Sequence, residues 1–462
     1  MTVPETFYED QLRPIFSAHD WLVAFDAAPP CLSVAASIRD KLGARSVRAL
    51  AASRGTGDLA ADVEHRILGV QADSMMSSIR ASEDALDAPP RAILDWLDDW
   101  DPGREARVIR PLFSKGQPIG GRRSWGARDP RWQALEDKTV IDAVWDAVGV
   151  PRAPSRTVSV DAESLAAAAR DLDRGHGTVW AGDNTSGWHG GASFTRWVET
   201  DDEAAEALAL FSGACQTARV MPFIEGVPCS IHGIVFDDDV RALRPCEMIV
   251  LRGTGRLKLA YAAASTFWDP APDDRDVMRE TARNVGRHLR ETLGYRGVFT
   301  IDGVMGVDGF MPTELNPRYG AAIGVMTRGM PHLPMYLLHC AMVEGEALDW
   351  RPAELERLIV AQADGHREGR AGMICHVRRD DQVKASLIWA DGGFQEAAED
   401  EEPHATLSLG PAAAGSYLHV NFSPAHTPVG PALGPRAAQA LIWADQRYGL
   451  GLGPLGGAPS VR

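Results

Sequence analysis

The sequence predicts a protein of mixed α and β structure in three parts: an α/β domain, a larger α+β domain and a small α+β domain. A chain of 462 residues exceeds what one hydrophobic core usually serves. Short apolar runs alternate with helical patterns up to about residue 135, which is typical of an α/β unit. Between 279 and 345 a helix, two β-like runs and another helix follow one another, an order that favours α+β structure with an antiparallel sheet.

Composition narrows the class of partner. Apolar residues make up 45% of the chain and charged residues 24%, as in an ordinary globular protein. The formal net charge is −16 and no basic stretch carries interleaved aromatics, so we expect no nucleic-acid partner. No run approaches the roughly 18 apolar residues of a membrane helix, and the first residues lack a signal pattern. We therefore expect a cytoplasmic protein without a membrane partner.

The first expected domain, 1–135, contains three apolar runs: WLVAF (21–25), SVRALAA (46–52) and ARVIRPLF (106–113). The apolar spacing of Arg91–Trp100 predicts a helix that ends before an Asp-Pro-Gly stop. The second expected domain, 136–345, opens near a segment whose apolar positions predict one helix ending at Gly149. The third, 346–462, combines β-like pieces with a last helix at 434–449. Its final segment, 451–462, is rich in Gly and Pro, and we expect it to be disordered.

The six cysteines, at 31, 215, 229, 246, 340 and 375, show neither CxxC pairs nor zinc spacing with histidine. We expect free buried thiols.

The most informative stretch is GYRGVFTIDGVMGVDGFMPTELNPRYGAA, residues 294–322. It predicts two strands, 298–305 and 310–316, joined as a hairpin. Because side chains alternate along a strand, Glu314 and Asn316 share a face. A three-residue loop ending in a left-handed Gly309 would place Asp302 opposite Glu314, whereas a two-residue Asp308-Gly309 turn would place it on the other side. A functional site on this hairpin therefore predicts the odd loop.

Two carboxylates and an amide oxygen on one face suit Mg²⁺, which takes oxygen ligands. Arg318 would add positive charge beside them. The alternative is a surface hairpin with solvated acids, and spacing alone does not exclude it.

The motif ELNPR after GYRGVFTID resembles the metal-binding signature of the ATP-grasp superfamily. The resemblance covers roughly 135–345 and implies an ATP-grasp fold, in which two α+β subdomains clamp ATP. It implies that Asp302, Glu314 and Asn316 bind two Mg²⁺, with Mn²⁺ able to substitute. It also implies that Arg318 serves the carboxylate or the intermediate.

The resemblance extends to the nucleotide grip. LEDKTVIDAVWDAVGVPRAP is similar to the segment whose lysine, here Lys138, touches the ATP phosphates. TVWAGDNTSGWHGGASFTRWV (178–198) resembles the strand, glycine loop and strand that close over the triphosphate. The resemblance places these residues of that stretch against ATP: Trp180, Ser186, Gly187, Gly190 and Gly191. Most members carry Lys-Pro where this chain has Ala181-Gly182, so Lys258, His189 or an arginine would have to replace the lost lysine.

VMPFIEGVPCSIHGIVF (220–236) is similar to the linker that holds adenine, which implies nucleotide contacts for Phe223 and Glu225. Position 228 is Pro where members often carry a ribose-binding acid. Lys258 would stand like a γ-phosphate lysine, and Glu247 and Arg252 are candidates for substrate contact, against the alternative of ordinary exposed charges.

In finer detail the chain resembles ATP-grasp ligases of actinobacterial secondary metabolism, including the pheganomycin-type peptide ligases. That resemblance implies a pre-ATP-grasp domain in front, a small domain behind, and formation of an amide from a carboxylate and an amine, such as an amino acid or peptide, through an acylphosphate. A thiol acceptor, a phosphorylated product and a degenerate nucleotide-binding regulatory protein stay open as alternatives. Self-association into a homodimer also stays open.

Overall fold

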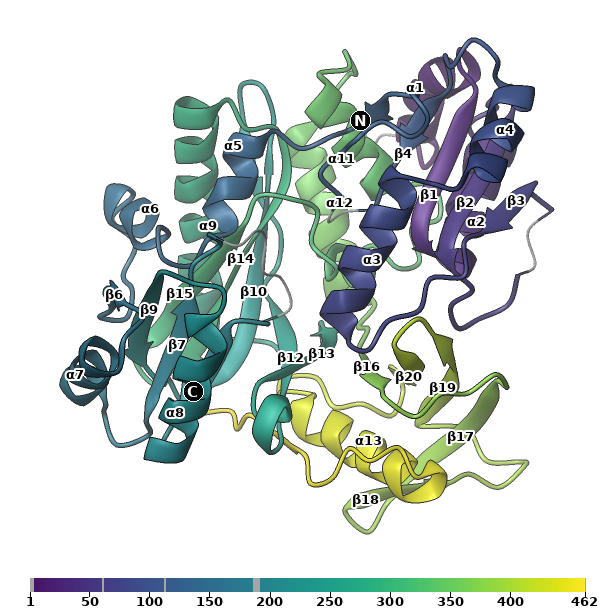
Figure 1. Ribbon diagram of the computed structural model, residues 1–462. Coiled ribbons are helices and arrows are strands. Elements are labelled where there is room, and N and C mark those ends of the chain that lie inside the picture. The colour runs from purple at the N-terminus through teal and green to yellow at the C-terminus, as the bar shows by residue number, and fades with distance from the viewer. Residues whose placement is uncertain (1–3, 60–61, 112–113, 186–191, 462) are drawn as a thin grey trace.

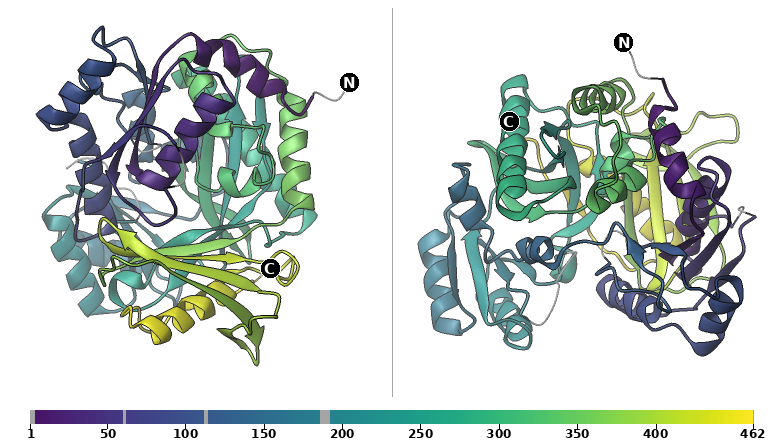
Figure 2. Two further views of the ribbon diagram at one scale, coloured as in Figure 1. Left: turned by 90° about the vertical axis from the view of Figure 1, so that its right-hand side faces the viewer. Right: turned by 90° about the horizontal axis from the view of Figure 1, so that it is seen from above.

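The computed structural model describes residues 4–59, 62–111, 114–185 and 192–461. Within those ranges the chain forms four sheets, each covered by helices (Figure 1). The largest sheet lies at the centre. Figures 1 and 2 show the N-terminal sheet and a small sheet on opposite sides of it, with the C-terminal sheet below. None of the described helices combines the length and the apolar character needed to cross a membrane.

The N-terminal sheet is entirely parallel, in the order β3-β2-β1-β4-β5. The predicted runs become β1 (Trp21–Ala27), β2 (Val47–Ser53) and β4 (Arg107–Ile109), and the predicted helix is α4 (Arg91–Trp100). Helices on both faces explain why β1 and β2 are almost continuously apolar. The remaining elements are α1 (Phe7–Ser17), α2 (Ala28–Asp40), β3 (His65–Ile67), α3 (Met75–Asp87) and β5 (Ser124–Trp125).

The segment that follows is not the single helix that we expected. It consists of α5 (Pro130–Gln133), a 3-10 turn η1 (Ala134–Glu136) and α6 (Asp142–Ala147). The carboxylate of Asp137 accepts hydrogen bonds from the backbone N–H of Thr139 at 2.8 Å and of Asn184 at 3.0 Å, which fixes a turn in place of a helix. Val140, counted as a core position, is 47% exposed. Lys138 therefore lies in this turn.

The small sheet is antiparallel, in the order β6-β9-β7-β8, with two helices on one face. Its helices begin at side-chain caps, Asp161 for α7 and a capping box of Thr200 and Glu203 for α8. The elements are β6 (Arg156–Ser159), α7 (Ala162–Leu172), β7 (Thr178–Gly182), β8 (Thr195–Val198), α8 (Asp201–Ser212) and β9 (Thr217–Pro222).

The central sheet runs β13-β12-β10-β14-β15, with β11 and β21 paired at its side. Its strands are β10 (Val227–Val235), β11 (Val240–Ala242), β12 (Cys246–Arg252), β13 (Ala260–Ser265), β14 (Gly297–Gly306) and β15 (Gly309–Asn316), with a 3-10 turn η2 (Gly255–Leu257) between β12 and β13. Helix α9 (Pro272–Leu293) buries an apolar stripe against one face of β10 and β14. The opposite face turns toward the small sheet.

After the central sheet come α10 (Ile323–Met326), α11 (Met335–Glu344) and α12 (Pro352–Gly365). Buried side chains of α11 and α12 join the core of the N-terminal domain. The C-terminal sheet follows, in the order β16-β20-β19-β17-β18, with strands β16 (Arg370–Cys375), β17 (Val383–Ala390), β18 (Gly393–Glu396), β19 (Ala405–Ala412) and β20 (Gly415–Phe422). Helix α13 (Gly434–Tyr448) covers it.

The tail is ordered up to Val461, contrary to our expectation. Leu452 and Leu455 are buried in the core of the C-terminal domain. Gly456 and Gly457 form β21, which pairs with Arg252 and Leu251 of β12. Composition misled here because the glycines, which usually loosen a chain, permit close contact with the start of α13.

Candidate active site

The β14–β15 hairpin places Asp302 directly opposite Glu314, and Thr300 opposite Asn316. The predicted odd loop is wrong: Gly306 pairs with Gly309, which leaves a two-residue turn. The odd residue lies within the strand instead. A bulge at Thr313 shifts the register between Gly303 and Asp302 by one, and this shift brings the two carboxylates to the same face.

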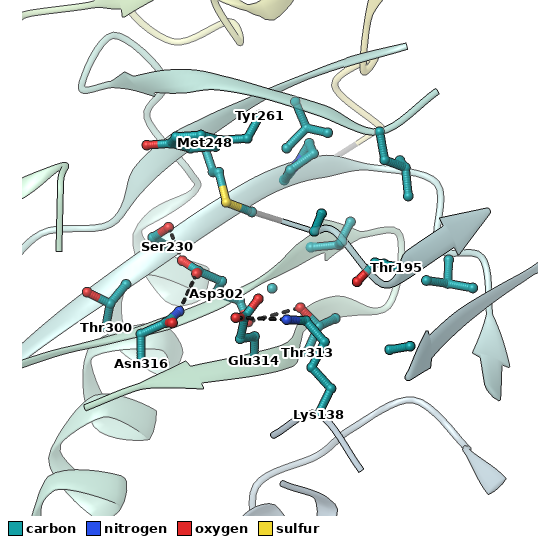
Figure 3. Close-up of a pocket in the computed structure, with 18 of the residues that line it drawn as sticks. Lys138, Thr195, Ser230, Met248, Tyr261, Thr300, Asp302, Thr313, Glu314 and Asn316 are labelled. Carbon is teal, nitrogen blue, oxygen red and sulfur yellow. Dashed lines mark hydrogen bonds and ion pairs between the residues drawn. The ribbon is translucent and has the colours of Figure 1, made fainter. Parts of the chain in front are cut away.

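The carboxylate of Asp302 is held from two strands (Figure 3). Ser230 of β10 donates its hydroxyl to Asp302 Oδ1 at 2.5 Å, and Asn316 of β15 donates its amide to Oδ2 at 2.8 Å. Arg318 donates to Asn316 Oδ1 at 2.8 Å. These contacts fix an acid, an amide and an arginine next to one another, as the sequence predicted.

Charge concentrates around this pair of carboxylates. Burial, and then the neighbouring Glu314 carboxylate, raise the pKa of Asp302 to about 6. The ammonium of Lys138 lies 2.9 Å from Glu314 Oε1, although its turn is distant in sequence (Figure 3). Arg318 Nε lies 3.2 Å from Glu136 Oε1, so Arg318 is anchored at two points. Three acids and two cations thus meet within a few contacts.

This cluster forms the floor of a cavity of about 460 Å³ between the central and the small sheet. On β10 and β12 the residues that line the cavity alternate along the strand: Pro228, Ser230 and His232, and Met248, Val250 and Arg252. Two adjacent rows run across β10, β14 and β15: Ser230, Asp302 and Glu314, then His232, Thr300 and Asn316. His232 Nδ1 and Thr300 Oγ1 are buried and have no hydrogen-bond partner among the described residues. Burial lowers the pKa of His232 to about 3, so this histidine is neutral.

The small sheet contributes the opposite wall, but not through Trp180. Val179 and Ala181 of β7 line the cavity, whereas Trp180 points to the core under α7 and α8 and is 2% exposed. The expected nucleotide contact of Trp180 is therefore corrected. Side chains do alternate along β7, but the residues that face the cavity are Val179 and Ala181 and not Trp180.

Arg219 is a cavity residue that the sequence analysis missed. It lies on β9 directly opposite Ala181, the position at which the expected lysine is absent. Its guanidinium is buried and makes two hydrogen bonds to Asp142, at 2.7 and 2.9 Å. The alternation of Arg219, Met221 and Phe223, which all line the cavity, was the available signal.

Phe223 and Arg252 both line the cavity. Arg252, which was expected to contact the substrate, lies against Phe223, which was expected to contact the nucleotide. Phe223 stacks on Trp197 of β8 with ring centroids 3.9 Å apart. The guanidinium of Arg252 lies 5.3 Å from the Phe223 ring centroid and is bound to both oxygens of Glu225. This cluster bridges the two sheets.

The structure does not place Lys258 beside Asp302 or Glu314. Its ammonium lies 2.7 Å from Glu199, pairs with Glu203 and stands 4.7 Å from the Trp197 ring centroid. It does not belong to the residues that line the cavity. The expected γ-phosphate contact of Lys258 is therefore corrected to a link between η2 and the β8–α8 edge of the small sheet.

Glu247 is not a substrate-contacting residue either. On β12, Met248 and Val250 face the cavity, and Glu247 points to the other side. Its carboxylate accepts hydrogen bonds from the backbone N–H of Leu433 at 2.6 Å and Gly434 at 2.8 Å, at the start of α13. Burial raises the pKa of Glu247 to about 7 against the effect of these bonds. Glu247 thus ties the central sheet to the C-terminal domain.

The glycine loop lies outside the described residues, and with it the predicted phosphate contacts of Ser186, Gly187, Gly190 and Gly191, and also His189.

Fold and site geometry together define the class of architecture. This is the ATP-grasp fold, preceded by an α/β domain and followed by a small C-terminal domain. No protein-family model matches the chain, and no curated protein matches it. The likeness is to solved structures.

One of these is the biotin carboxylase domain of the 2-oxoglutarate carboxylase of Hydrogenobacter thermophilus, in complex with MgADP, ADP and bicarbonate. It has a TM-score of 0.53 and 15% identity over 88% of this chain and 86% of that one. Another is a variant of the pyruvate carboxylase of Rhizobium etli with acetyl coenzyme A, with a TM-score of 0.54 and 13% identity over 88% of this chain and 38% of that one. At these identities the likeness establishes the fold.

Proposed function

We propose that the chain is an ATP-dependent ligase that joins a carboxylate to an amine through an acylphosphate. One observation carries the proposal: Asp302, Glu314 and Asn316 present oxygen atoms on one face of a hairpin, with Lys138 and Arg318 in contact with them. They form the floor of a cavity between the two sheets of an ATP-grasp fold. Such a site suits an anionic substrate that arrives with divalent cations.

The donor set fits magnesium. Its three side chains offer carboxylate and amide oxygens, without thiol or imidazole, and Mg²⁺ prefers oxygen ligands. A structure of the same fold, the biotin carboxylase domain named above, contains MgADP. We therefore assign Mg²⁺, two ions with Mn²⁺ as a substitute, to Asp302, Glu314 and Asn316. The bound metal supplies Lewis-acid polarisation and neutralises phosphate charge.

The proposed chemistry has two steps. A carboxylate oxygen of the first substrate attacks the γ-phosphorus of ATP, the bond from that phosphorus to the β–γ bridging oxygen breaks, and ADP leaves with the electron pair. The amine nitrogen of the second substrate then attacks the acyl carbon, the bond from carbon to the phosphate oxygen breaks, and phosphate leaves as the nitrogen loses a proton. In both steps negative charge lies on the oxygens of the reacting groups. The protein therefore acts by positioning the substrates and neutralising this charge.

The side chains divide these tasks. Arg318, held by Glu136 and Asn316, would stabilise the acyl group and the phosphoryl group during transfer. Lys138 lies beside Glu314 and would reach a phosphate oxygen as a compact positive donor. Arg219 lies beside Ala181 on the neighbouring strand of the same wall and would supply the charge that a lysine there would have given. Phe223 and Arg252 border the end where the adenine would bind.

The finer assignment rests on sequence resemblance. It points to a peptide or amide ligase of bacterial secondary metabolism that takes small-molecule substrates, such as amino acids or peptides. A thiol acceptor would use the same first step.

The test is ADP release by the purified protein with MgATP, a panel of carboxylic acids and a panel of amines, followed by mass spectrometry of the product. We expect ADP release that needs an acid, and a product whose mass equals acid plus amine minus water. ADP release that no acid or amine stimulates, or a protein that binds MgATP without turnover, would contradict the proposal and favour a regulatory nucleotide-binding protein.

A further inference from the structure

The part of the cavity that lies over β12 and β13 is lined by apolar side chains. We call it the apolar subsite and define it by six side chains that line the cavity: Ile79, Met248, Val250, Tyr261, Ala264 and Ala322. Figure 3 shows Met248 and Tyr261 on the side of Asp302 away from Lys138. Lys138 and the apolar subsite therefore lie on opposite sides of Asp302.

A bulge in β13 aims Tyr261 into this subsite. Ile249 pairs with Ala263, but Val250 pairs with Tyr261, so Ala262 is the extra residue. In a regular strand, Tyr261 and Ala264 would point to opposite faces, yet both line the cavity. Ala263 has a φ of 138°, a backbone conformation that non-glycine residues rarely adopt. Strain of this kind is typical of functional sites, where it fixes a side chain that the site needs.

The six side chains of the subsite are uncharged, and charged residues of the same cavity border it: Asp302 and Arg318, which both influence the pKa of Tyr261, and Arg252, which follows Val250 on the same face of β12. Nη2 of Arg318 is 2.8 Å from Asn316 Oδ1. A charged group buried against Met248, Tyr261 and Ala264 would lose water without gaining a partner. A carboxylate beside Arg318 would gain one.

We propose that the acid activated by this ligase has an uncharged, apolar body, which binds in the apolar subsite while its carboxylate lies beside Arg318. Tyr261, held by the bulge, sets the size of the body that fits. This inference rests on the proposed function, because it names the substrate class of the same site.

The test uses hydroxylamine as the amine, so that the natural amine need not be known. The readouts are ADP release and hydroxamate formation. Two matched series of six-carbon acids differ only at the far end: norleucine, lysine and 2-aminoadipate, and hexanoate, 6-aminohexanoate and adipate. We expect the acid that ends in a methyl group to exceed its two charged partners in kcat/KM by about tenfold or more in at least one series.

Variants test whether the preference for acids that end in a methyl group arises in the apolar subsite. Ala264→Phe fills the subsite, and we expect it to raise the KM for the preferred acid by about tenfold while the KM for ATP stays unchanged. Tyr261→Phe should retain the preference, because it keeps the ring, whereas Tyr261→Ala should accept bulkier acids and bind the original acid more weakly. Val277→Ala on the exposed face of α9 serves as the control and should behave like the wild type.

The outcomes separate the two proposals. A ligase that in both series uses a charged acid as well as the acid that ends in a methyl group, or whose preference survives both Ala264→Phe and Tyr261→Ala, overturns the substrate class and leaves the ligase in place. MgATP binding without acid-dependent ADP release overturns the proposed function itself. If Ala264→Phe fails to fold, Tyr261→Phe and Tyr261→Ala, compared at equal folded fraction, still decide the question.

Discussion

Asp302 and Glu314 face each other across the β14–β15 hairpin because Thr313 is an extra residue between them and the turn. Without this bulge, the two-residue turn would pair Asp302 with Thr313 and move Glu314 out of register. The hydroxyl of Thr313 donates to the backbone carbonyl of Asp302 at 3.2 Å, across the same bulge. Turn length and bulge together determine whether two carboxylates can share one cation.

Replacing Glu314 tests the metal assignment. Glu314→Ala removes a carboxylate from the proposed metal face, and we expect acid-dependent ADP release to fall by about 100-fold to 1,000-fold. The fold should remain intact by circular dichroism and melting temperature, because the side chain is partly exposed. Asp308→Ala, at the exposed tip of the same hairpin, is the matched control and should keep wild-type turnover. Near-normal turnover of Glu314→Ala would contradict the assignment of a metal site to this hairpin.

Replacing Arg219 tests the proposal that this arginine of the small sheet contacts the phosphates of ATP. If Arg219 supplies the charge missing at Ala181, Arg219→Ala should raise the KM for ATP and the Kd for MgADP by about tenfold or more, while the KM for the acid changes little. Arg219→Lys should recover part of this affinity, because it keeps the charge but loses the two-point contact with Asp142.

The control for Arg219 is Arg152→Ala, which removes a second, weaker arginine partner of Asp142, 3.8 Å away, that does not line the cavity. Its nucleotide affinity should match that of the wild type. Unchanged calorimetric titration of Arg219→Ala with MgADP would mean that Arg219 only supports the fold.

Most elements of the fold and the existence of the β14–β15 hairpin could be predicted because they depend on local pattern, whereas the length of its turn was predicted wrongly. The apolar runs of the N-terminal domain and the alternation in β14 and β15 determine which side chains share a face. Pattern does not say which face borders the cavity when both are buried. For this reason Trp180 and Glu247 were predicted to contact the nucleotide and the substrate, whereas their neighbours Ala181 and Met248 are the residues that line the cavity.

Contacts between distant segments were also beyond reach. Arg219 and Ala181 become neighbours only through the pairing of β7 with β9. The bulges at Thr313 and Ala262 depend on the strands that lie beside them, so nothing local in the sequence marks them.

Replacing Glu247 tests its structural role. Glu247→Ala leaves two buried backbone N–H groups without an acceptor, so we expect the free energy of unfolding at neutral pH to fall by about 1–3 kcal/mol. Glu247→Gln provides a reference that does not titrate. At a temperature well below the melting point, acid-dependent kcat should stay near that of the wild type. A large loss of kcat without loss of stability would show that Glu247 has a catalytic role, as the sequence had suggested.

The pH dependence of this difference has a definite sign. The pKa of Glu247 is about 7 in the folded chain, against about 4.3 for glutamate in an unfolded chain. Between these values the folded state holds a proton that the unfolded state has lost, so this residue makes unfolding free energy fall as pH rises from about 4.3 to 7. Wild type should therefore gain stability relative to Glu247→Gln as pH is lowered through that window, as measured by urea unfolding at several pH values.

Two neighbouring glycines test the docking of the C-terminal tail. A Cβ on Gly457 would lie 2.3 Å from the backbone carbon of Gly434, whereas a Cβ on Gly456 would lie no closer than 3.7 Å to Arg252 O. Gly457→Ala should therefore lower the free energy of unfolding by about 1–3 kcal/mol through overpacking, and Gly456→Ala should change it by less than about 0.5 kcal/mol. Both variants have the same composition, so a disordered tail would leave them equally stable in thermal and urea unfolding. A selective loss at Gly457 would instead show that β21 packs between β12 and α13.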